Sequence, residues 1–518
     1  MKNRKPPTRG QKARRHANER HPAGAKAPIA VAALAAPLDP AQGRLFKSCP
    51  DAKLLAAAAK SSAKEGGAQS AARDSANSSA QLVEIEKPVY GGAFLAHVEG
   101  KAVFVPLTLP GEQARIRVTQ SKSGYSTAEA VEIVAASPAR VQPRCPHFGA
   151  CGGCNYQHAG YENELAFKQQ ILRETLERGG VAVPEKIETL AAEPWAYRNR
   201  IRLAFDAEGR PGYRGRKSHG IVPISQCPIA APLLVCAAQA AGEMLERVPA
   251  NLRPKELALF CDAAESTLMA TLFAGDTAGV RLEPLAAALK ERIAELKSAQ
   301  LAADGRPGHP ARMLARWGAD SIRYSAAGFD YRVDQGAFFQ VNRWLVDALV
   351  ERVTRGASGK LAWDMFAGVG LFARRLTANF ERVVAVESAP PAVEALDENL
   401  KGTTGTGVRA ATLDFLRSAA SSQGPDRIVP DLIIVDPPRS GLGADVTALL
   451  AQVASAELVY VSCDPATLAR DLRALVASGY EIESVTLADL FPQTFHMETI
   501  VRLRRCVRAD LPRLRKME

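Results

Sequence analysis

The sequence predicts an α/β protein of several domains, whose largest part is a parallel sheet covered by helices on both faces. From residue 360 onward, apolar strand segments alternate with helical segments, which is typical of repeated βα units. Residues 81–137 instead hold short alternating strands separated by turns, which predict a small β-barrel. The 518 residues suffice for about three domains, and a hydrophobic content of 47 % supports real cores.

These patterns divide the chain into four parts. Residues 1–80 are rich in Ala, Ser and Gly and have too little large apolar surface to fold, so we expect a disordered basic tail. Residues 81–137 are the predicted barrel, residues 138–330 a central α+β domain, and residues 331–518 the domain of the parallel sheet.

The excess positive charge lies in the tail. Of the formal net charge of +11, residues 1–80 carry +10, with 15 Lys or Arg against 5 Asp or Glu. The tail is either an electrostatic RNA-binding arm or a passive extension. Its basic start imitates a signal or transit peptide, but the apolar run 29–36 is weak. The apolar stretch 27–37 is shorter than the roughly 20 residues of a membrane helix, so we expect no membrane span.

The predicted strands and helices follow from hydrophobic periodicity. The barrel strands are expected at 82–86, 93–98, 102–107, 114–120 and 128–134. Helices are expected in the central domain at 161–179 and 282–297. The strands of the third domain are expected at 361–367, 382–388, 408–414, 432–438, 457–463, 480–491 and 499–505. No helix separates the last two strands, which predicts an antiparallel pair at the edge of the sheet.

A glycine-rich turn after the first of these strands is a candidate cofactor site. Gly368 and Gly370 let the backbone approach a ligand, and Glu387 ends the next strand, where its carboxylate could accept hydrogen bonds from ribose hydroxyls. The turn also fits the dinucleotide fingerprint of dehydrogenases, and alone it could be an ordinary tight turn. Asp436, followed by two prolines at the end of the fourth strand, favours methyl transfer.

Cys463 is the candidate nucleophile. It follows an apolar strand in the segment Ser-Cys-Asp-Pro, at the carboxyl edge of the sheet where open α/β sheets bind ligands. A thiolate can add to carbon 6 of uracil and make carbon 5 nucleophilic toward a sulfonium methyl group. A base must then remove the proton on carbon 5, and Glu498 is our candidate. A buried cysteine is otherwise a small core residue, and a lone glutamate a surface charge.

The nine cysteines predict a reducing compartment and a metal site. Cys145, Cys151 and Cys154 have the spacing C-x₅-C-x₂-C, and Cys227 is a plausible fourth ligand. Four thiolates suit either an iron–sulfur cluster or a structural zinc ion, and their chemistry alone does not choose. Residues 195–217 interleave basic and aromatic side chains, which suits RNA binding but also fits a solvated hairpin.

Over residues 82–503 the chain resembles the bacterial RNA uracil-5-methyltransferases, most closely the 23S ribosomal RNA type. The resemblance implies a TRAM domain, which is an OB-like RNA-binding barrel, then an iron–sulfur domain, then a Rossmann-like class I methyltransferase domain. The residues that it implies for S-adenosylmethionine are Gln340, Phe366, Glu387 and Asp436. It implies Cys463 as the nucleophile and Glu498 as the proton acceptor. The cysteines at 145, 151, 154 and 227 match the ligands of a [4Fe–4S] cluster.

The chain departs from this family pattern at Leu371, where the family often has a polar Asn or Thr. For an acidic cofactor contact after the third strand, Asp414 is the nearest candidate, outside the core set of residues. We expect a cytoplasmic monomer that acts on RNA and, by analogy with the ribosomal branch, on 23S rRNA. The rivals are a transfer RNA uracil-5 enzyme, a cytosine-5 enzyme and a non-catalytic RNA-binding protein. The cytosine-5 enzymes usually carry a cysteine beside the prolines that follow Asp436, and this chain has none there.

Overall fold

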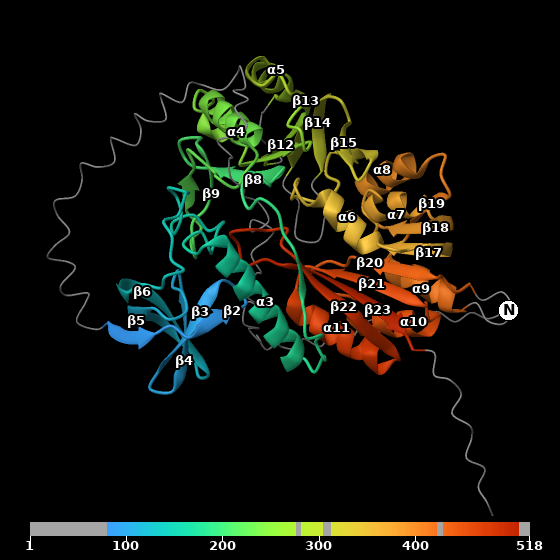
Figure 1. Cartoon of the computed structure of the whole chain (residues 1–518). Helices are drawn as coiled ribbons and strands as arrows, with labels where there is room; N and C mark the ends of the chain where they lie inside the picture. Colours follow the sequence, from blue (N-terminus) through green and yellow to red (C-terminus); the bar gives the residue numbers. More distant parts are fainter. Residues whose placement is uncertain (1–79, 276–280, 304–311, 422–427, 507–518) are drawn as a thin grey trace, which may run out of the picture.

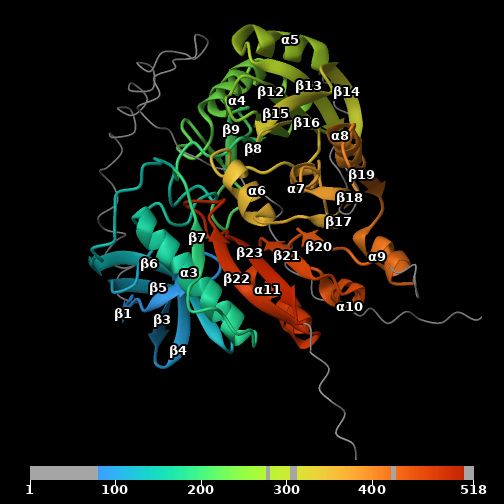
Figure 2. The same cartoon turned by 45° about the vertical axis from the view of Figure 1, so that its right-hand side comes forward.

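The protein is described by a computed structural model over residues 80–275, 281–303, 312–421 and 428–506. The predicted tail lies outside these residues except for its last position. Figures 1 and 2 show three bodies: a small sheet, a mixed sheet with two helices, and a larger sheet with helices on both faces. The long helix α3 (Tyr161–Arg178) runs between the small sheet and the large one. None of the helices in the described part of the chain has the length and apolar character of a membrane span.

The small sheet has six strands in the order β1-β5-β6-β4-β3-β2. Their bounds are β1 (Gln81–Glu84), β2 (Lys87–Val89), β3 (Ala93–Val98), β4 (Lys101–Pro106), β5 (Gln113–Ser121) and β6 (Tyr125–Ala135). All neighbours are antiparallel except β4 and β6. The sequence predicted five strands, and the addition is β2. It contains Pro88, which an edge position tolerates because the edge needs no N–H from that residue.

The central region holds a seven-stranded sheet in the order β10-β9-β8-β11-β12-β13-β14 and a separate hairpin, β15 with β16. The sheet strands are β8 (Arg200–Phe205), β9 (Pro211–Arg214), β10 (Ile221–Pro223), β11 (Glu256–Cys261), β12 (Leu268–Ala274), β13 (Leu296–Ala303) and β14 (Met313–Gly318). The hairpin is β15 (Ser321–Ala326) with β16 (Phe329–Asp334), and the helical segments are α4 (Pro232–Leu245), η1 (Ala250–Leu252) and α5 (Leu282–Arg292). Figure 1 shows α4 and α5 at the top of the molecule.

Two helices of this region differ from the sequence prediction. Helix α5 ends at Arg292, five residues early, because the chain turns at Ile293 into the parallel strand β13. Helix α4 was not predicted, although Pro232 at its first turn followed by an apolar run is a recognisable start signal.

The large sheet has the order β19-β18-β17-β20-β21-β23-β22-β7. Its strands are β7 (Glu188–Leu190), β17 (Gly359–Met365), β18 (Phe380–Glu387), β19 (Gly405–Arg409), β20 (Leu432–Val435), β21 (Glu457–Ser462), β22 (Tyr480–Ala488) and β23 (Glu498–Arg505). The first five in this order are parallel, and β23 is antiparallel to both β21 and β22. Strand β7, from outside the predicted third domain, pairs in parallel with β22 and covers the expected edge.

Helices cover both faces of the large sheet, as expected for strands whose residues are buried on both sides. They are α6 (Val346–Thr354), α7 (Leu371–Leu376), α8 (Pro390–Leu400), α9 (Thr412–Ser421), α10 (Gly443–Val453) and α11 (Pro465–Ala477). All four residues of β20 are buried, which explains why it reads as one apolar run. Helix α3 packs on α11 and β22 on one side and on β2 on the other, so it joins the small sheet to the large one.

Candidate active site and cysteine pocket

A pocket lies at the carboxyl ends of the parallel strands, where open α/β sheets bind their ligands. Phe366 follows β17, Glu387 ends β18, and both line this pocket. Its other walls come from the start of α9 and the loop between β20 and α10: Ser388, Ala411, Thr412, Leu413, Pro438, Ser440, Gly441, Leu442 and Val446, with Val386 of β18. The arrangement suits a nucleoside-bearing ligand laid across the strand ends.

The glycine turn is hydrogen-bonded to the carboxylate of Glu387. Gly368 and Gly370 have φ angles of +55° and +87°, in the left-handed region that favours glycine. A Cβ on Gly370 would lie 2.6 Å from the side chain of Leu396. The Gly368 N–H donates to Oε2 of Glu387 at 2.9 Å, and the other carboxylate oxygen accepts from the N–H groups of Ser388 and Ala389. Oε2, which accepts only one of these three hydrogen bonds, keeps a lone pair for a ribose hydroxyl.

The remaining residues expected at the cofactor do not line this pocket. Gln340 is buried, and its backbone oxygen accepts from Asn199 Nδ2 at 3.0 Å. Asp436 follows β20, and its backbone N–H donates to Met365 at 3.4 Å. The side chain of Asp436 instead interacts with the groups around Cys463. Asp414 is exposed and pairs with Arg417 at 3.5 Å, so Leu413 and Thr412, not Asp414, provide that wall of the pocket.

The register of two strands brings Cys463 and Glu498 together. Strands β21 and β23 are antiparallel, and their last pair is Ser462 opposite Thr499. Continuing this register by one residue places Cys463, just after β21, opposite Glu498, at the start of β23. The antiparallel strand therefore brings the expected base next to the expected nucleophile, although the two residues are 35 positions apart in the sequence.

The thiol of Cys463 lies among carboxyl groups. Burial raises the pKa of Cys463, and the carboxylates of Glu498 and Asp436 raise it further, while Arg439 opposes them. Burial raises the pKa of Asp436 to about 7 and that of Glu498 well above its ordinary value. Oε1 of Glu498 is buried and has no hydrogen-bond partner among the residues that the structure describes. A proton can thus move between the thiol and a nearby carboxylate.

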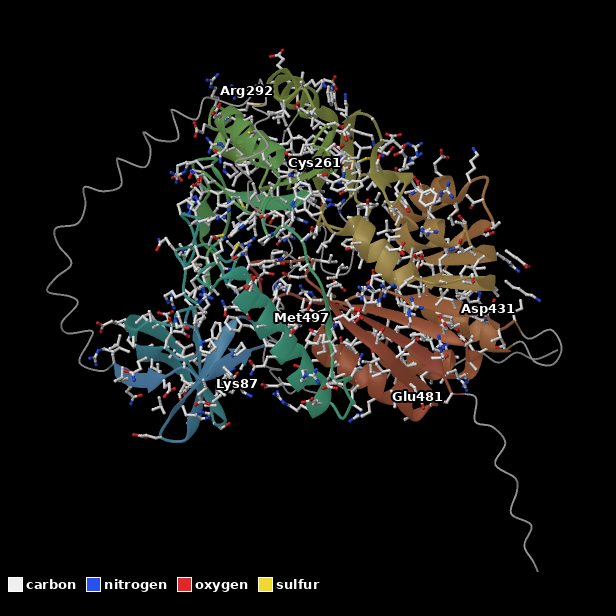
Figure 3. All side chains as sticks on the ribbon, viewed as in Figure 1. Lys87, Cys261, Arg292, Asp431, Glu481 and Met497 are labelled. Atoms are coloured by element: carbon white, nitrogen blue, oxygen red, sulfur yellow. The ribbon has the colours of Figure 1, made fainter. Side chains whose placement is uncertain are left out.

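His496 is a neighbour that the sequence did not single out. Its Nδ1 lies 3.0 Å from Nη2 of Arg439, so the ring accepts a hydrogen bond from the guanidinium. Burial, reinforced by Arg439, lowers the pKa of His496 to about 2, which keeps the imidazole neutral. The only sequence signal was its place two residues before Glu498. Met497 between them is fully buried in the core beside α3 (Figure 3).

The four grouped cysteines line one small cavity. Cys145, Cys151, Cys154 and Cys227 surround it together with His147, Phe148, Gln157 and Tyr213. Burial raises the pKa of all four thiols, and for Cys154 the next largest cause is Cys227. Two donors point at sulfur: Gly153 N–H to Cys151 at 3.4 Å and Gln157 Nε2 to Cys154 at 3.3 Å. Within the described ranges, no group of three or more His, Cys, Asp or Glu is arranged to hold a single metal ion.

The basic and aromatic segment 195–217 has both buried and exposed side chains, and the exposed basic ones are Arg202, Arg210, Arg214 and Lys217. Arg198 and Tyr213 are buried, and the buried Tyr197 donates its hydroxyl to the backbone oxygen of Pro492. Arg202 pairs with Glu256 at 2.5 Å. Tyr197, Arg198 and Tyr213 therefore belong to the interior, where a contact with RNA is not supported. At the exposed positions the contact with RNA stays a prediction.

Comparisons with known proteins agree with this geometry. The family model described as tRNA (Uracil-5-)-methyltransferase matches residues 319–506, and the TRAM domain model matches residues 76–131. A 23S rRNA (uracil(1939)-C(5))-methyltransferase from Chromohalobacter salexigens is 33 % identical, over 84 % of this chain and 91 % of the relative. A protein of the same name from Alkalilimnicola ehrlichii is 32 % identical, over 80 % and 94 %.

Among solved structures, the tRNA (uracil-54, C5)-methyltransferase of Pyrococcus abyssi in complex with S-adenosyl-L-homocysteine has a TM-score of 0.63. It is 23 % identical and covers 82 % of this chain and 100 % of that chain. The fold and its pocket thus define a class I S-adenosylmethionine-dependent methyltransferase that carries a TRAM domain. The chain belongs to the RNA uracil-5-methyltransferase family. The family and the enzyme class predicted from the sequence are confirmed.

Proposed function

We propose that the protein methylates carbon 5 of a uridine in 23S rRNA through a covalent bond to Cys463. The observation that carries this mechanism is the register of β21 and β23, which sets Cys463 opposite Glu498. S-adenosylmethionine supplies the methyl group. The relatives from Chromohalobacter salexigens and Alkalilimnicola ehrlichii, whose names specify 23S rRNA, support the choice of RNA.

The proposed reaction uses two side chains, Cys463 as the nucleophile and Glu498 as the base. The thiolate of Cys463 adds to carbon 6, so the C5–C6 double bond opens and negative charge moves to the oxygen on carbon 4. Carbon 5 then attacks the methyl group, and S-adenosylhomocysteine leaves. Glu498 accepts the proton on carbon 5, the double bond re-forms, and the bond between sulfur and carbon 6 breaks to return the thiolate. The first thiol proton goes to the carboxylate of Asp436, which leaves Glu498 free to accept the proton on carbon 5, while the neutral His496 accepts a hydrogen bond from Arg439.

For the cofactor we propose that Phe366 and Glu387 hold the nucleoside part, supported by Gly368 and Gly370. Both side chains line the pocket at the strand ends, and the carboxylate of Glu387 is fixed by three backbone N–H groups. Gln340 and Asp436 would act nearer the methyl group and the uracil. The position of Asp436 beside Cys463 and Glu498 supports this division.

For the four cysteines we propose a [4Fe–4S] cluster in a structural role. Their thiols surround one cavity, and two N–H groups already donate to sulfur, as suits thiolate ligands. We further propose that β1–β6 form the OB-like RNA-binding barrel of the TRAM domain, and that the enzyme works as a cytoplasmic monomer. The match of residues 76–131 to the TRAM model supports the first of these.

The substrate proposal is tested with the purified protein, S-adenosylmethionine and two RNAs, a 23S rRNA fragment library and total transfer RNA. Nucleoside analysis by mass spectrometry should find new 5-methyluridine in 23S rRNA alone. New 5-methyluridine in transfer RNA would make the tRNA alternative correct, and 5-methylcytidine would make the protein a cytosine enzyme.

A further inference from the structure

A turn of the small sheet reaches the catalytic residues. Tyr90 follows β2, and the turn continues through Gly91 and Gly92 to β3. The side chain of Tyr90 packs against the core of the large sheet, not that of its own sheet. Its ring meets the ring of Phe495 edge to face, with centroids 5.7 Å apart. Tyr90 is thus a residue of the TRAM domain placed at the methyltransferase site.

The Tyr90 hydroxyl binds the residue next to the nucleophile. It donates to Oδ2 of Asp464 at 3.1 Å. The other oxygen, Oδ1, caps helix α11 by accepting from the N–H groups of Ala466 and Thr467, each at 3.0 Å. Both oxygens of this carboxylate are therefore engaged, and the backbone of Asp464 directly continues that of Cys463. Burial, and then the Asp464 carboxylate, raise the pKa of Tyr90, so its hydroxyl keeps the proton that it donates.

The same turn fits closely against the loop that carries the base. A Cβ on Gly92 would lie 2.8 Å from the Asn155 side chain. Asn155 in turn donates its backbone N–H to the Gln493 oxygen at 2.8 Å, and its Oδ1 accepts from the Phe495 N–H at 3.3 Å. The turn therefore meets both the nucleophile segment and the segment that leads to Glu498.

We propose that Tyr90 is a positioning residue that holds Cys463 in its attacking geometry through Asp464, and so makes nucleophilic attack depend on the docked TRAM domain. The proposal rests on the proposed function of Cys463. When Tyr90 holds Oδ2 of Asp464, the capping carboxylate is fixed and the turn between β21 and α11 has one conformation. Without that hydrogen bond the carboxylate could rotate and the turn could shift. Small displacements of a reacting atom have large effects on rate.

The test measures how fast the enzyme forms a covalent adduct with RNA that carries 5-fluorouridine. Fluorine replaces the proton that the base must remove, so the methylated adduct stays attached and is counted on a denaturing gel. At saturating RNA and S-adenosylmethionine, Tyr90→Phe should form the adduct about tenfold more slowly, the effect of losing one hydrogen bond to a charged group. Its affinity for RNA should stay that of the wild type, and its unfolding temperature should fall by only about 2–4 °C.

Asp464→Asn is the second variant of the test, because asparagine still caps helix α11 while the charged partner of the Tyr90 hydroxyl is lost. If Tyr90 acts through Asp464, the double variant should be no slower than the slower single variant. Tyr125→Phe is the matched control: Tyr125 lies in β6 of the same sheet with its ring 5.4 Å from Phe104, and its variant should react at the wild-type rate. A wild-type rate for Tyr90→Phe, or additive losses in the double variant, would overturn the positioning role.

The failure of the proposed function looks different. In that case the Cys463→Ala protein would form as much adduct as the wild type, and Tyr90 would have no nucleophile to position. A loss of adduct in Cys463→Ala together with a normal rate in Tyr90→Phe would overturn only the role of Tyr90.

Discussion

The single cysteine Cys463 and the four cysteines of the cysteine pocket share one property and differ in another. Burial raises the pKa of Cys463 and of the four thiols in the cysteine pocket. For Cys463 the next causes are the carboxylates of Glu498 and Asp436, whereas for Cys154 and Cys227 they are other thiols of the pocket. A thiol beside a carboxylate has a proton acceptor and can become a nucleophile. Four thiols beside one another need an external cation to hold their charge.

The largest expected effect is on the catalytic side of this comparison. Cys463→Ala should lower uridine methylation by at least about 10⁴-fold, because the variant lacks the thiolate that we propose adds to carbon 6. Binding of S-adenosylmethionine, followed by calorimetry, should be unchanged, because Cys463 does not line the cofactor pocket. If the methylation rate of Cys463→Ala were within a factor of ten of the wild-type rate, Cys463 would not be the nucleophile.

The cysteine pocket should respond in stability and in metal content. Cys227→Ala should purify without stoichiometric iron and sulfide and unfold roughly 5–10 °C lower, because ligand binding contributes to folding. Cys261→Ala is the matched control, since Cys261 is also a buried thiol of the central region but does not line the pocket (Figure 3). The Cys261→Ala protein should keep its iron, and its free energy of unfolding should fall by about 1 kcal/mol. Zinc without iron in the wild-type protein would contradict the cluster proposal.

The pH dependence of adduct formation sharpens the contrast further. The raised pKa of Cys463 leaves the thiol protonated at neutral pH, so the thiolate fraction grows about tenfold per pH unit below that pKa. Single-turnover adduct formation should therefore rise steadily between pH 6 and 8. His496, with a pKa of about 2, adds no titration in this range, whereas Asp436, with a pKa of about 7, also loses its proton there and can then accept that of the thiol. A rate that falls or stays flat with rising pH would mean that Cys463 is already ionised.

The smallest expected effect concerns Asp364, a buried carboxyl in β17 whose Oδ2 accepts from the Ala373 N–H at 2.8 Å. Burial raises its pKa from 3.8 to about 8, so the folded state holds a proton that the unfolded state has released. Stability should therefore fall as the pH rises from about 4 to about 8. Asp364→Asn keeps an acceptor but cannot ionise, so its unfolding temperature at pH 8 should exceed that of the wild type by about 3 °C. An equal or lower value would contradict this assignment.

The alternation of strands and helices along the catalytic domain was predictable where a parallel strand is an apolar run followed by a turn and a helix, as in β20. Strand β19 has the sequence GTGVR, which is not such a run. It was expected at residues 408–414 but spans Gly405–Arg409. The facing of Cys463 and Glu498 was not predictable from the pattern, because only the tertiary register of β21 and β23 sets it. Strand β7 was missed for the same reason, since its three residues gain their partner from β22, far along the chain.

Side-chain environments were the harder part to predict. The residue type of Arg198 suggested a surface contact with RNA, yet the side chain is buried beneath the loop before Glu498. His496 and Tyr90 carry no local signal of their role, because their partners Arg439 and Asp464 lie elsewhere in the sequence. By contrast, the glycines at 368 and 370 were recognisable because their positive φ angles exclude most other residues.

The most direct test of the central claim is the Glu498→Gln protein with RNA and S-adenosylmethionine carrying a labelled methyl group. Addition of Cys463 and methyl transfer remain available to this variant, but the proton on carbon 5 has no acceptor. The account predicts that labelled, methylated RNA accumulates in a covalent complex with the protein that survives denaturing electrophoresis and is absent from a Cys463→Ala, Glu498→Gln double variant. Normal turnover by Glu498→Gln, with free 5-methyluridine RNA and no complex, would contradict it.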